Sequence, residues 1–165
     1  MPVNSLTDSS NPYAKFLGEQ EPLAVIGATP DRLRALAAKV GPAKIGVAPA
    51  PGKWSAAEIL CHLADCEIAF GFRLRQTLAE DNHVIQPFDQ EKWASPYSGF
   101  PADAAVSAFG AARRWNLLLI QGALAEFAEK PLTHPERGTM TFATIVETMA
   151  GHDLNHIAQL EGIAG

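Results

Sequence analysis

Two histidines, His152 and His156, lie four residues apart in an apolar stripe near the C-terminus of the chain. On a helix, this spacing places both imidazoles on one face, one turn apart. The same face carries apolar residues at helical spacing, namely Phe142, Ile145, Met149, Leu160 and Ile163. Burying two imidazoles among such neighbours costs free energy unless their nitrogens find partners. A divalent metal is one such partner, so the stripe predicts a helix from about Thr141 to Ile163 that offers two ligands to one ion.

The composition is that of one ordinary globular domain. The 165 residues are 47% hydrophobic and 19% charged, which allows a sizeable core in a single domain over residues 1–165. The net charge of −5 disfavours nucleic-acid binding, because phosphate contacts need clustered Lys and Arg. No run of apolar residues is long enough to cross a membrane. Residues 1–11 lack the features of a secretory signal and are expected to form a poorly ordered leader.

The two cysteines are expected to be reduced. Cys61 and Cys66 are five residues apart within one predicted helix, so their side chains point about 140° apart around its axis. This geometry disfavours a mutual disulfide. We therefore expect a cytoplasmic protein.

Two helices are predicted in the first half of the chain. Thr29 and Pro30 form a favourable helix start, and the apolar stripe that follows continues until Gly41 ends the helix. A second helix begins after Ser55, which forms a capping-box pattern with Glu58, and it runs to about residue 79.

The second half adds a long connection and two further helices. Residues 80–99 contain two prolines and three large aromatic residues, which predicts a connection that caps one end of a bundle. A third helix is expected over residues 102–129, ended by Lys130 and Pro131, and residues 133–139 are expected to form a polar turn. No segment shows convincing alternation, so we predict an all-α fold, a four-helix bundle with a long connection between its second and third helices.

His62 is the remaining histidine that is expected to face the core. It lies on the apolar side of the second helix, whereas His83 and His134 fall in predicted loops and are expected to be solvated. A site built from facing helices would combine His62 with the C-terminal pair. Three neutral imidazoles around Zn²⁺ or Ni²⁺ leave a position for water or substrate. A hydrogen-bonded core histidine is the other interpretation, and the residues alone leave both open.

Two motifs resemble those of a known family. Residues 54–67, with a tryptophan, a capped helix start and then His62-Leu63-Ala64-Asp65, are similar to the second-helix signature of the DinB-like (damage-inducible) family of metal-binding four-helix bundles. Residues 152–160 resemble the final-helix motif of that family, His-x-x-x-His-x-x-Gln-Leu/Ile. The resemblance extends over about residues 13–163. It implies that the family's three metal-binding histidines correspond to His62, His152 and His156.

Four polar residues near the predicted site each allow two interpretations. Asp65 and Gln159, each one turn after a histidine, either orient a ligand imidazole or lie at the rim of the core. Cys66 is a fourth ligand or reactive thiolate, or else a small buried filler. Arg73 binds an anion such as a substrate carboxylate, or it forms a structural ion pair.

Other conspicuous residues are assigned no catalytic role. Trp93 and Tyr97 in the connection either line a pocket over the metal or close the end of the bundle. Arg113 and Arg114 are expected on a solvated helix face. No pair of acidic residues has a spacing typical of general acid–base catalysis, so the catalytic residues stay unassigned.

These features predict a metal-dependent enzyme with a small-molecule substrate. The family resembled here includes transferases and isomerases that use a low-molecular-weight thiol, such as bacillithiol or mycothiol. The resemblance therefore implies a divalent metal and adds such a thiol as a candidate cofactor, whose sulfur the metal would hold as a thiolate. Hydrolysis is also open, although no general base is evident.

Two alternatives to an enzyme remain at this stage. One is a non-catalytic, stress-related bundle that binds a metal or a small molecule. The other is an apolar bundle with hydrogen-bonded core histidines and no metal. A homodimer is a further expectation, because helical bundles of this kind often pair through a helix face.

Overall fold

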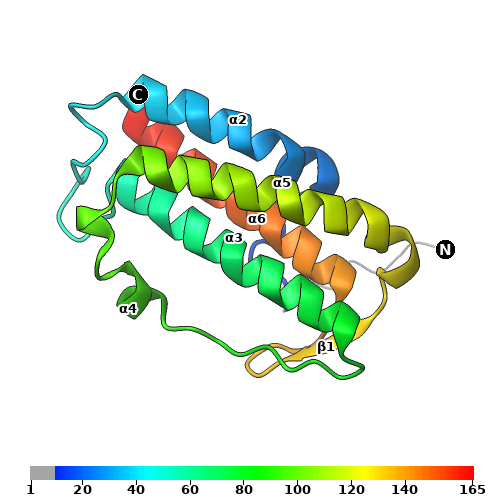
Figure 1. Ribbon diagram of the computed structural model, residues 1–165. Coiled ribbons are helices and arrows are strands. Elements are labelled where there is room, and N and C mark those ends of the chain that lie inside the picture. Colours follow the sequence, from blue (N-terminus) through cyan, green and yellow to red (C-terminus); the bar gives the residue numbers. More distant parts are fainter. Residues whose placement is uncertain (1–9) are drawn as a thin grey trace.

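Residues 10–165 are described by a computed structural model, shown in Figure 1. The elements in chain order are α1 (Ala14–Leu17), α2 (Pro22–Val40), α3 (Ala56–Ala79), α4 (Gln90–Ala94), the short 3-10 helix η1 (Tyr97–Gly99), α5 (Ala102–Phe127), β1 (Pro131–His134), β2 (Gly138–Thr141) and α6 (Phe142–Ala164). Residues 1–9 of the expected leader lie outside the described residues, while Ser10 and Asn11 are buried.

The connection between α3 and α5 decides the directions of the bundle helices. From the end of α3 beside the hairpin, residues 80–101 return along the length of the bundle to its other end (Figure 1). As a result α5 runs parallel to α3, whereas α2 and α6 run in the opposite direction. The predicted all-α four-helix bundle with a long connection between its second and third main helices is confirmed.

Local capping signals fix where the two histidine-bearing helices begin. At the start of α3, the Glu58 backbone N–H donates to Ser55 Oγ at 3.3 Å, and the Ser55 N–H donates to Glu58 Oε2 at 2.8 Å. At the start of α6, the Thr144 N–H donates to Thr141 Oγ1 at 3.2 Å. These bonds satisfy backbone donors that the first helical turn leaves free. Both helix starts agree with the sequence prediction.

The start of α2 differs from the prediction. The helix begins at Pro22 rather than at Thr29, so Pro30 lies in its interior. An interior proline has no N–H for the carbonyl four residues earlier, here that of Ile26. In the folded chain, Arg113 Nη1 donates to this Ile26 oxygen at 2.9 Å and replaces the missing bond. A partner on another helix therefore makes the interior proline tolerable.

The segment predicted as a polar turn is instead an antiparallel hairpin. Strands β1 and β2 pair in register from Pro131 opposite Thr141 to His134 opposite Gly138. The strands have four residues each, too short for alternation to stand out in the sequence. Residues 83–85 of the long connection add a parallel bridge to β1, since the Ile85 N–H donates to the Thr133 oxygen at 2.9 Å. The hairpin thus anchors the connection.

Two further expectations can be compared with the structure. Cys61 and Cys66 are both buried and free, as expected. Within the described residues, no helix has the length and apolar character needed to cross a membrane.

Candidate metal centre

Three histidine side chains from two helices meet inside the bundle. His62 comes from α3, and His152 and His156 come from α6, which packs against α3. One ring nitrogen from each of the three lies within 4.8 Å of the others, and the Nε2 atoms of His62 and His152 are 3.0 Å apart. The three residues are 2%, 4% and 6% exposed, respectively. The structure therefore brings together the three histidines singled out by the sequence.

Aromatic rings surround the cluster. The centroids of the Trp54 and His62 rings are 5.0 Å apart. The Tyr13 ring lies edge-on to the His152 ring, with 5.1 Å between the ring centroids. Phe70 contacts His152 from another side at 5.9 Å. Tyr13 can approach α6 closely because residue 151 is a glycine. A Cβ atom added there would lie 2.5 Å from the backbone carbonyl oxygen of Tyr13. Sequence periodicity did not reveal Tyr13, which reaches the site from outside the bundle helices.

The environment keeps all three imidazoles neutral at physiological pH. Burial, and then the nearby His156, lower the pKa of His62 to about 3. Burial and the other two histidines lower the pKa of His152 well below its ordinary value, and burial lowers that of His156. The neutral imidazole is the form that binds metal ions.

The hydrogen bond between His156 and Gln159 fixes the orientation of one imidazole of the cluster. The two side chains meet at 2.8 Å between Nδ1 and Oε1. Since an amide oxygen only accepts, Nδ1 carries the hydrogen and Nε2 keeps its lone pair. This is the contact that orients metal-binding histidines in many proteins. Of the two interpretations of Gln159, the structure favours the orienting one.

The donor set fits a divalent ion of the zinc type. Two imidazole nitrogens that bind one tetrahedral Zn²⁺ lie roughly 3.3 Å apart, given bond lengths of about 2.0–2.1 Å. The separation of 3.0 Å between His62 Nε2 and His152 Nε2 is close to this value. Two lone pairs at this distance repel, so either a proton or a cation must lie between them. Three imidazoles also leave room for a further ligand, as in open rather than structural sites.

Three other candidates from the sequence have structural partners. Cys66 Sγ lies 3.5 Å from His62 Nε2. Burial raises the pKa of the Cys66 thiol to about 12, which favours a protonated thiol that fills space in the core over a thiolate ligand. Asp65 accepts a 2.6 Å hydrogen bond from the Tyr97 hydroxyl, so its contact is with the long connection and not with an imidazole. Trp93 is half-exposed and stacks on Phe88.

A charged network lies directly behind the histidines, and it overturns the prediction of a solvated Arg113. This side chain is 1% exposed, and its guanidinium donates to Asp153 Oδ2 at 2.6 Å and to Glu67 Oε2 at 2.7 Å. Burial lowers the pKa of Arg113, but attraction to Asp153 and then to Glu67 outweighs burial and raises it overall. Asp153 also accepts a 2.7 Å bond from Thr29. Arg114, the next residue, is exposed as expected.

The remaining two histidines are buried, contrary to the prediction that they are solvated. His83 and His134 are each 5% exposed, because the connection and β1 pair with each other and enclose them. Neither belongs to the three-histidine cluster. His83 Nδ1 lies 2.7 Å from Glu80 Oε2, and His134 Nδ1 accepts from the Glu136 backbone at 3.1 Å.

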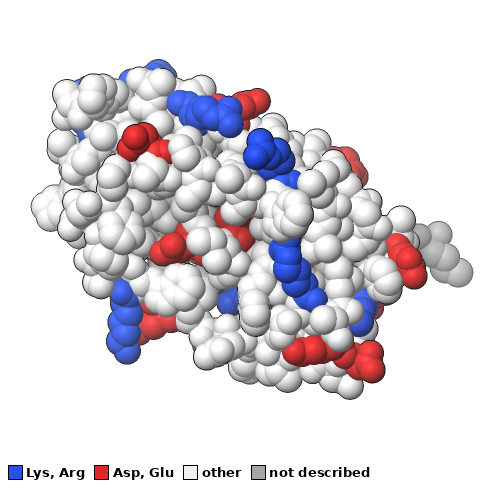
Figure 2. Space-filling model, in the orientation of Figure 1, with Lys and Arg blue, Asp and Glu red and all other residues white. Residues whose placement is uncertain are grey.

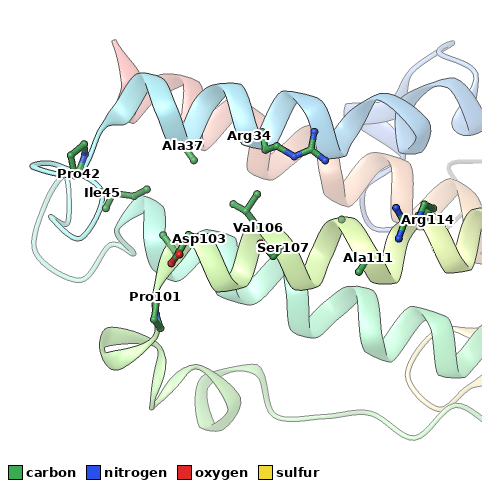
Figure 3. Close-up of a pocket in the computed structure, with 12 residues that line it drawn as sticks. Arg34, Ala37, Pro42, Ile45, Pro101, Asp103, Val106, Ser107, Ala111 and Arg114 are labelled. Carbon is green, nitrogen blue, oxygen red and sulfur yellow. The ribbon is translucent and has the colours of Figure 1, made fainter.

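Two pockets reach the cluster. One of about 190 Å³ has His152 in its wall, and another of about 710 Å³ has His156 and Trp54. A third, of about 810 Å³, lies elsewhere between α2 and α5, with Arg34 and Arg114 on its two walls (Figure 3). None of the three clustered histidines lines this third pocket.

The charged side chains do not mark a polyanion-binding surface on the face shown in Figure 2. Lys and Arg there alternate with Asp and Glu and are separated by wide uncharged areas.

Comparison with known sequences points to one family. The sequence pattern of the DinB superfamily matches residues 26–160 of the chain. A relative from Oceanobacillus iheyensis, named "Putative metal-dependent hydrolase", is 29% identical over 114 residues, or 68% of this chain and 66% of the relative. A relative of the same name from Bacillus cereus is 30% identical over 114 residues, or 68% of this chain and 65% of the relative. The match thus spans slightly less than two thirds of the length of these curated relatives.

Comparison with solved structures agrees on the fold. YfiT from Bacillus subtilis, described as a probable metal-dependent hydrolase with an unusual four-helix bundle topology, matches with a TM-score of 0.77. The match covers 99% of this chain and 90% of that chain at 18% sequence identity. At this identity the likeness concerns the fold alone.

Proposed function

Since the chain belongs to the DinB superfamily, we propose that it is a metal-dependent hydrolase that acts on a small molecule. His62, His152 and His156 hold a divalent ion in this proposal. The finding that carries it is the convergence of three neutral imidazoles at a point that two pockets reach.

The residues of the chain supply binding and orientation. The three imidazoles would hold a divalent ion of the zinc type, which would supply Lewis-acid chemistry at a substrate oxygen or a water molecule. Gln159 accepts the hydrogen bond of His156 Nδ1 and so leaves Nε2 of that ring free to act as a ligand. The rings of Trp54, Tyr13 and Phe70 exclude bulk water from the cluster, which strengthens electrostatic interactions within it.

The names of the relatives support the same reaction class. The relatives from Oceanobacillus iheyensis and Bacillus cereus, and YfiT from Bacillus subtilis, are all described as metal-dependent hydrolases, with the qualifications given above.

Metal analysis of the untagged protein tests the ligand set. We expect about one divalent ion per chain in the wild type, and loss of the ion in His62→Ala and in His156→Ala. His83→Ala is the matched control, because this histidine is also buried but lies outside the cluster. Circular dichroism verifies that each variant is folded. Metal that persists in both cluster variants, or that is lost equally in the control, would contradict the proposal.

Turnover assays test the reaction class. The probes are 4-nitrophenyl acetate, an acyl 4-nitroanilide and 4-nitrophenyl phosphate, each with metal-free and zinc- or nickel-loaded protein. We expect hydrolysis of at least one probe that requires metal and disappears in His156→Ala. Metal-loaded protein that hydrolyses none of them would contradict this assignment.

A thiol-dependent transferase or isomerase is the alternative that the sequence resemblance implied. A metal centre with a free position also suits a thiolate ligand. Adding bacillithiol or mycothiol to the same assays separates the two functions. Turnover that requires the thiol favours the transferase, and turnover without it favours the hydrolase. The homodimer remains a prediction from the sequence.

A further inference from the structure

The pocket beside His152 has two arginine side chains in its wall. It holds about 190 Å³ and lies between α3, the long connection and the hairpin turn. Arg73 reaches it from α3, and Arg137 reaches it from the turn between β1 and β2. Both side chains are half-buried. Two guanidinium groups thus share a small pocket next to the candidate metal centre.

Neither arginine forms an ion pair with a carboxylate among residues 10–165, in contrast to the buried Arg113 of the bundle. Arg113 binds two buried carboxylates, and Arg75 donates to the side chain of Asn116 at 2.7 Å. Glu136 is the acidic residue in the pocket wall, and it is exposed, with its backbone N–H donating to His134 Nδ1.

Like charges in a partly desolvated pocket repel each other. Burial lowers the pKa of Arg73, Cys66 partly offsets this, and the positive charge of Arg137 lowers the pKa further. Both arginines also lower the pKa of His134, after the larger effect of burial, and the smaller effect of Glu136 raises it. The folded chain therefore maintains an unfavourable concentration of positive charge that an anion would relieve.

Aromatic rings hold one of the two arginines in place. The Arg73 guanidinium lies 6.0 Å from the centre of the Phe70 ring and 5.5 Å from that of the Phe88 ring. Cation–π contacts of this kind restrict the side chain and leave its N–H edge free for hydrogen bonds. The same rings, with Ala69 and Pro87, give the pocket an apolar part.

We propose that this pocket binds the anionic group of the substrate, a carboxylate or a phosphate, through Arg73 and Arg137. The apolar part of the pocket accepts the carbon skeleton, and the anchored molecule lies beside His152. The substrate class is therefore a small organic anion. This inference rests on the proposed function, because it assigns the pocket to the substrate of the same metal centre.

The fork of N–H donors on arginine matches the oxygen spacing of both carboxylates and phosphates. Two such forks from different elements fix the direction as well as the position of the anion. A neutral analogue of the same shape would lose both charge-assisted contacts. Charge, rather than size alone, is thus expected to decide which small molecules the pocket accepts.

Calorimetric titration with benzoate, benzamide and inorganic phosphate tests the pocket without relying on turnover. Benzamide is the neutral analogue of benzoate, and phosphate tests the second anionic group. Each probe is titrated into metal-free and into zinc-loaded protein, since a carboxylate can also bind an exposed metal ion. The variants are Arg73→Met and Arg137→Met, and the control is Arg114→Met, an exposed arginine outside this pocket.

We expect benzoate or phosphate to bind the metal-free wild type, with at least tenfold weaker binding in Arg73→Met and in Arg137→Met. Arg114→Met should bind like the wild type, and Arg73→Lys should recover part of the affinity because it keeps the charge but not the fork. Circular dichroism checks that every variant is folded.

Three results would overturn the inference. They are absence of binding by both anions, equal binding of benzamide and benzoate, and unchanged affinity in both Arg→Met variants. A failure of the proposed function looks different, because metal would then be absent or unaffected by the histidine variants while the anion still binds the metal-free protein.

Discussion

Two polar clusters share the interior of the bundle, and they differ in whether opposite charges balance them. The charged cluster, formed by Arg113, Glu67 and Asp153, is closed by strong hydrogen bonds of 2.6 and 2.7 Å. The three-histidine cluster has ring nitrogens 3.0 Å apart that face one another, and two pockets reach it. Both clusters are nearly inaccessible to solvent.

The difference separates a structural role from a functional one. A buried cation that is paired with two buried carboxylates holds elements together and has no need of a ligand. Buried nitrogens with lone pairs directed at one point are costly unless something occupies that point. Asp153 and His152 are neighbours in sequence, so the charged cluster also fixes the part of α6 that presents the histidines.

The largest effect is expected from breaking the charged cluster. Arg113→Met would leave Glu67 and Asp153 buried without their cation, and the free energy of unfolding should fall by about 3–5 kcal/mol. Urea denaturation measures the change. Arg114→Met is the matched control, since the exposed neighbour should change stability by less than about 0.5 kcal/mol. Similar losses in both variants would contradict the structural role.

The next effect concerns metal binding to the histidine cluster. Zinc at 100 times its dissociation constant should raise the free energy of unfolding by about 2.7 kcal/mol, because the ion binds only the folded site. The increase should be absent in His156→Ala and reversed by a chelator. Urea denaturation with and without zinc measures the increase. If zinc does not change the free energy of unfolding of the wild type, the histidine cluster has no more need of a ligand than the charged cluster has.

Acid should destabilise the metal-free protein through the same histidines. The unfolded chain takes up a proton at His62 near pH 6.5, whereas the folded chain does so only near pH 3. Unfolding therefore takes up protons between these values, and the stability present above pH 6.5 is lost as the pH falls through this window. The slope should be about 1.4 kcal/mol per pH unit for each histidine that titrates. Urea denaturation at several pH values, with His62→Gln for comparison, should show a smaller slope in the variant.

The smallest effect is expected from the residue that orients His156. Gln159→Leu removes the acceptor for Nδ1–H, and the metal affinity should fall about tenfold. The stability of the metal-free protein should stay within about 0.5 kcal/mol, because Gln159 is exposed. Competition with a chromophoric chelator measures the affinity. Gln121→Leu, at another exposed glutamine on a helix, should leave it unchanged.

Much of the bundle and the identity of the clustered histidines followed from local patterns. The capping pattern at Ser55 and the apolar stripes located α3 and α6, and the phase of those stripes turned His62, His152 and His156 inward. Their role as metal ligands remains a prediction for the metal analysis to test. The family resemblance is confirmed by the match over residues 26–160.

The errors at Arg113, His83 and His134 share one physical origin. Arg113 was expected in solvent because its partners lie on α2, α3 and α6, far from it in sequence, although its spacing from Phe109 places it on the buried stripe of α5. His83 and His134 were expected in solvent because the pairing of the connection with β1 encloses them. In each case a distant segment decided the environment.

The sequence by itself determined the presence of the four long helices and the inward positions of the three histidines, because capping bonds and helical periodicity act between residues at most four or so apart. Only the tertiary structure decided that Arg113 would pair with two buried carboxylates, and that Arg73 and Arg137 would meet in a pocket beside His152. Those arrangements depend on which distant segments pack together. Packing of that kind is set by the whole chain and leaves no local pattern in the sequence.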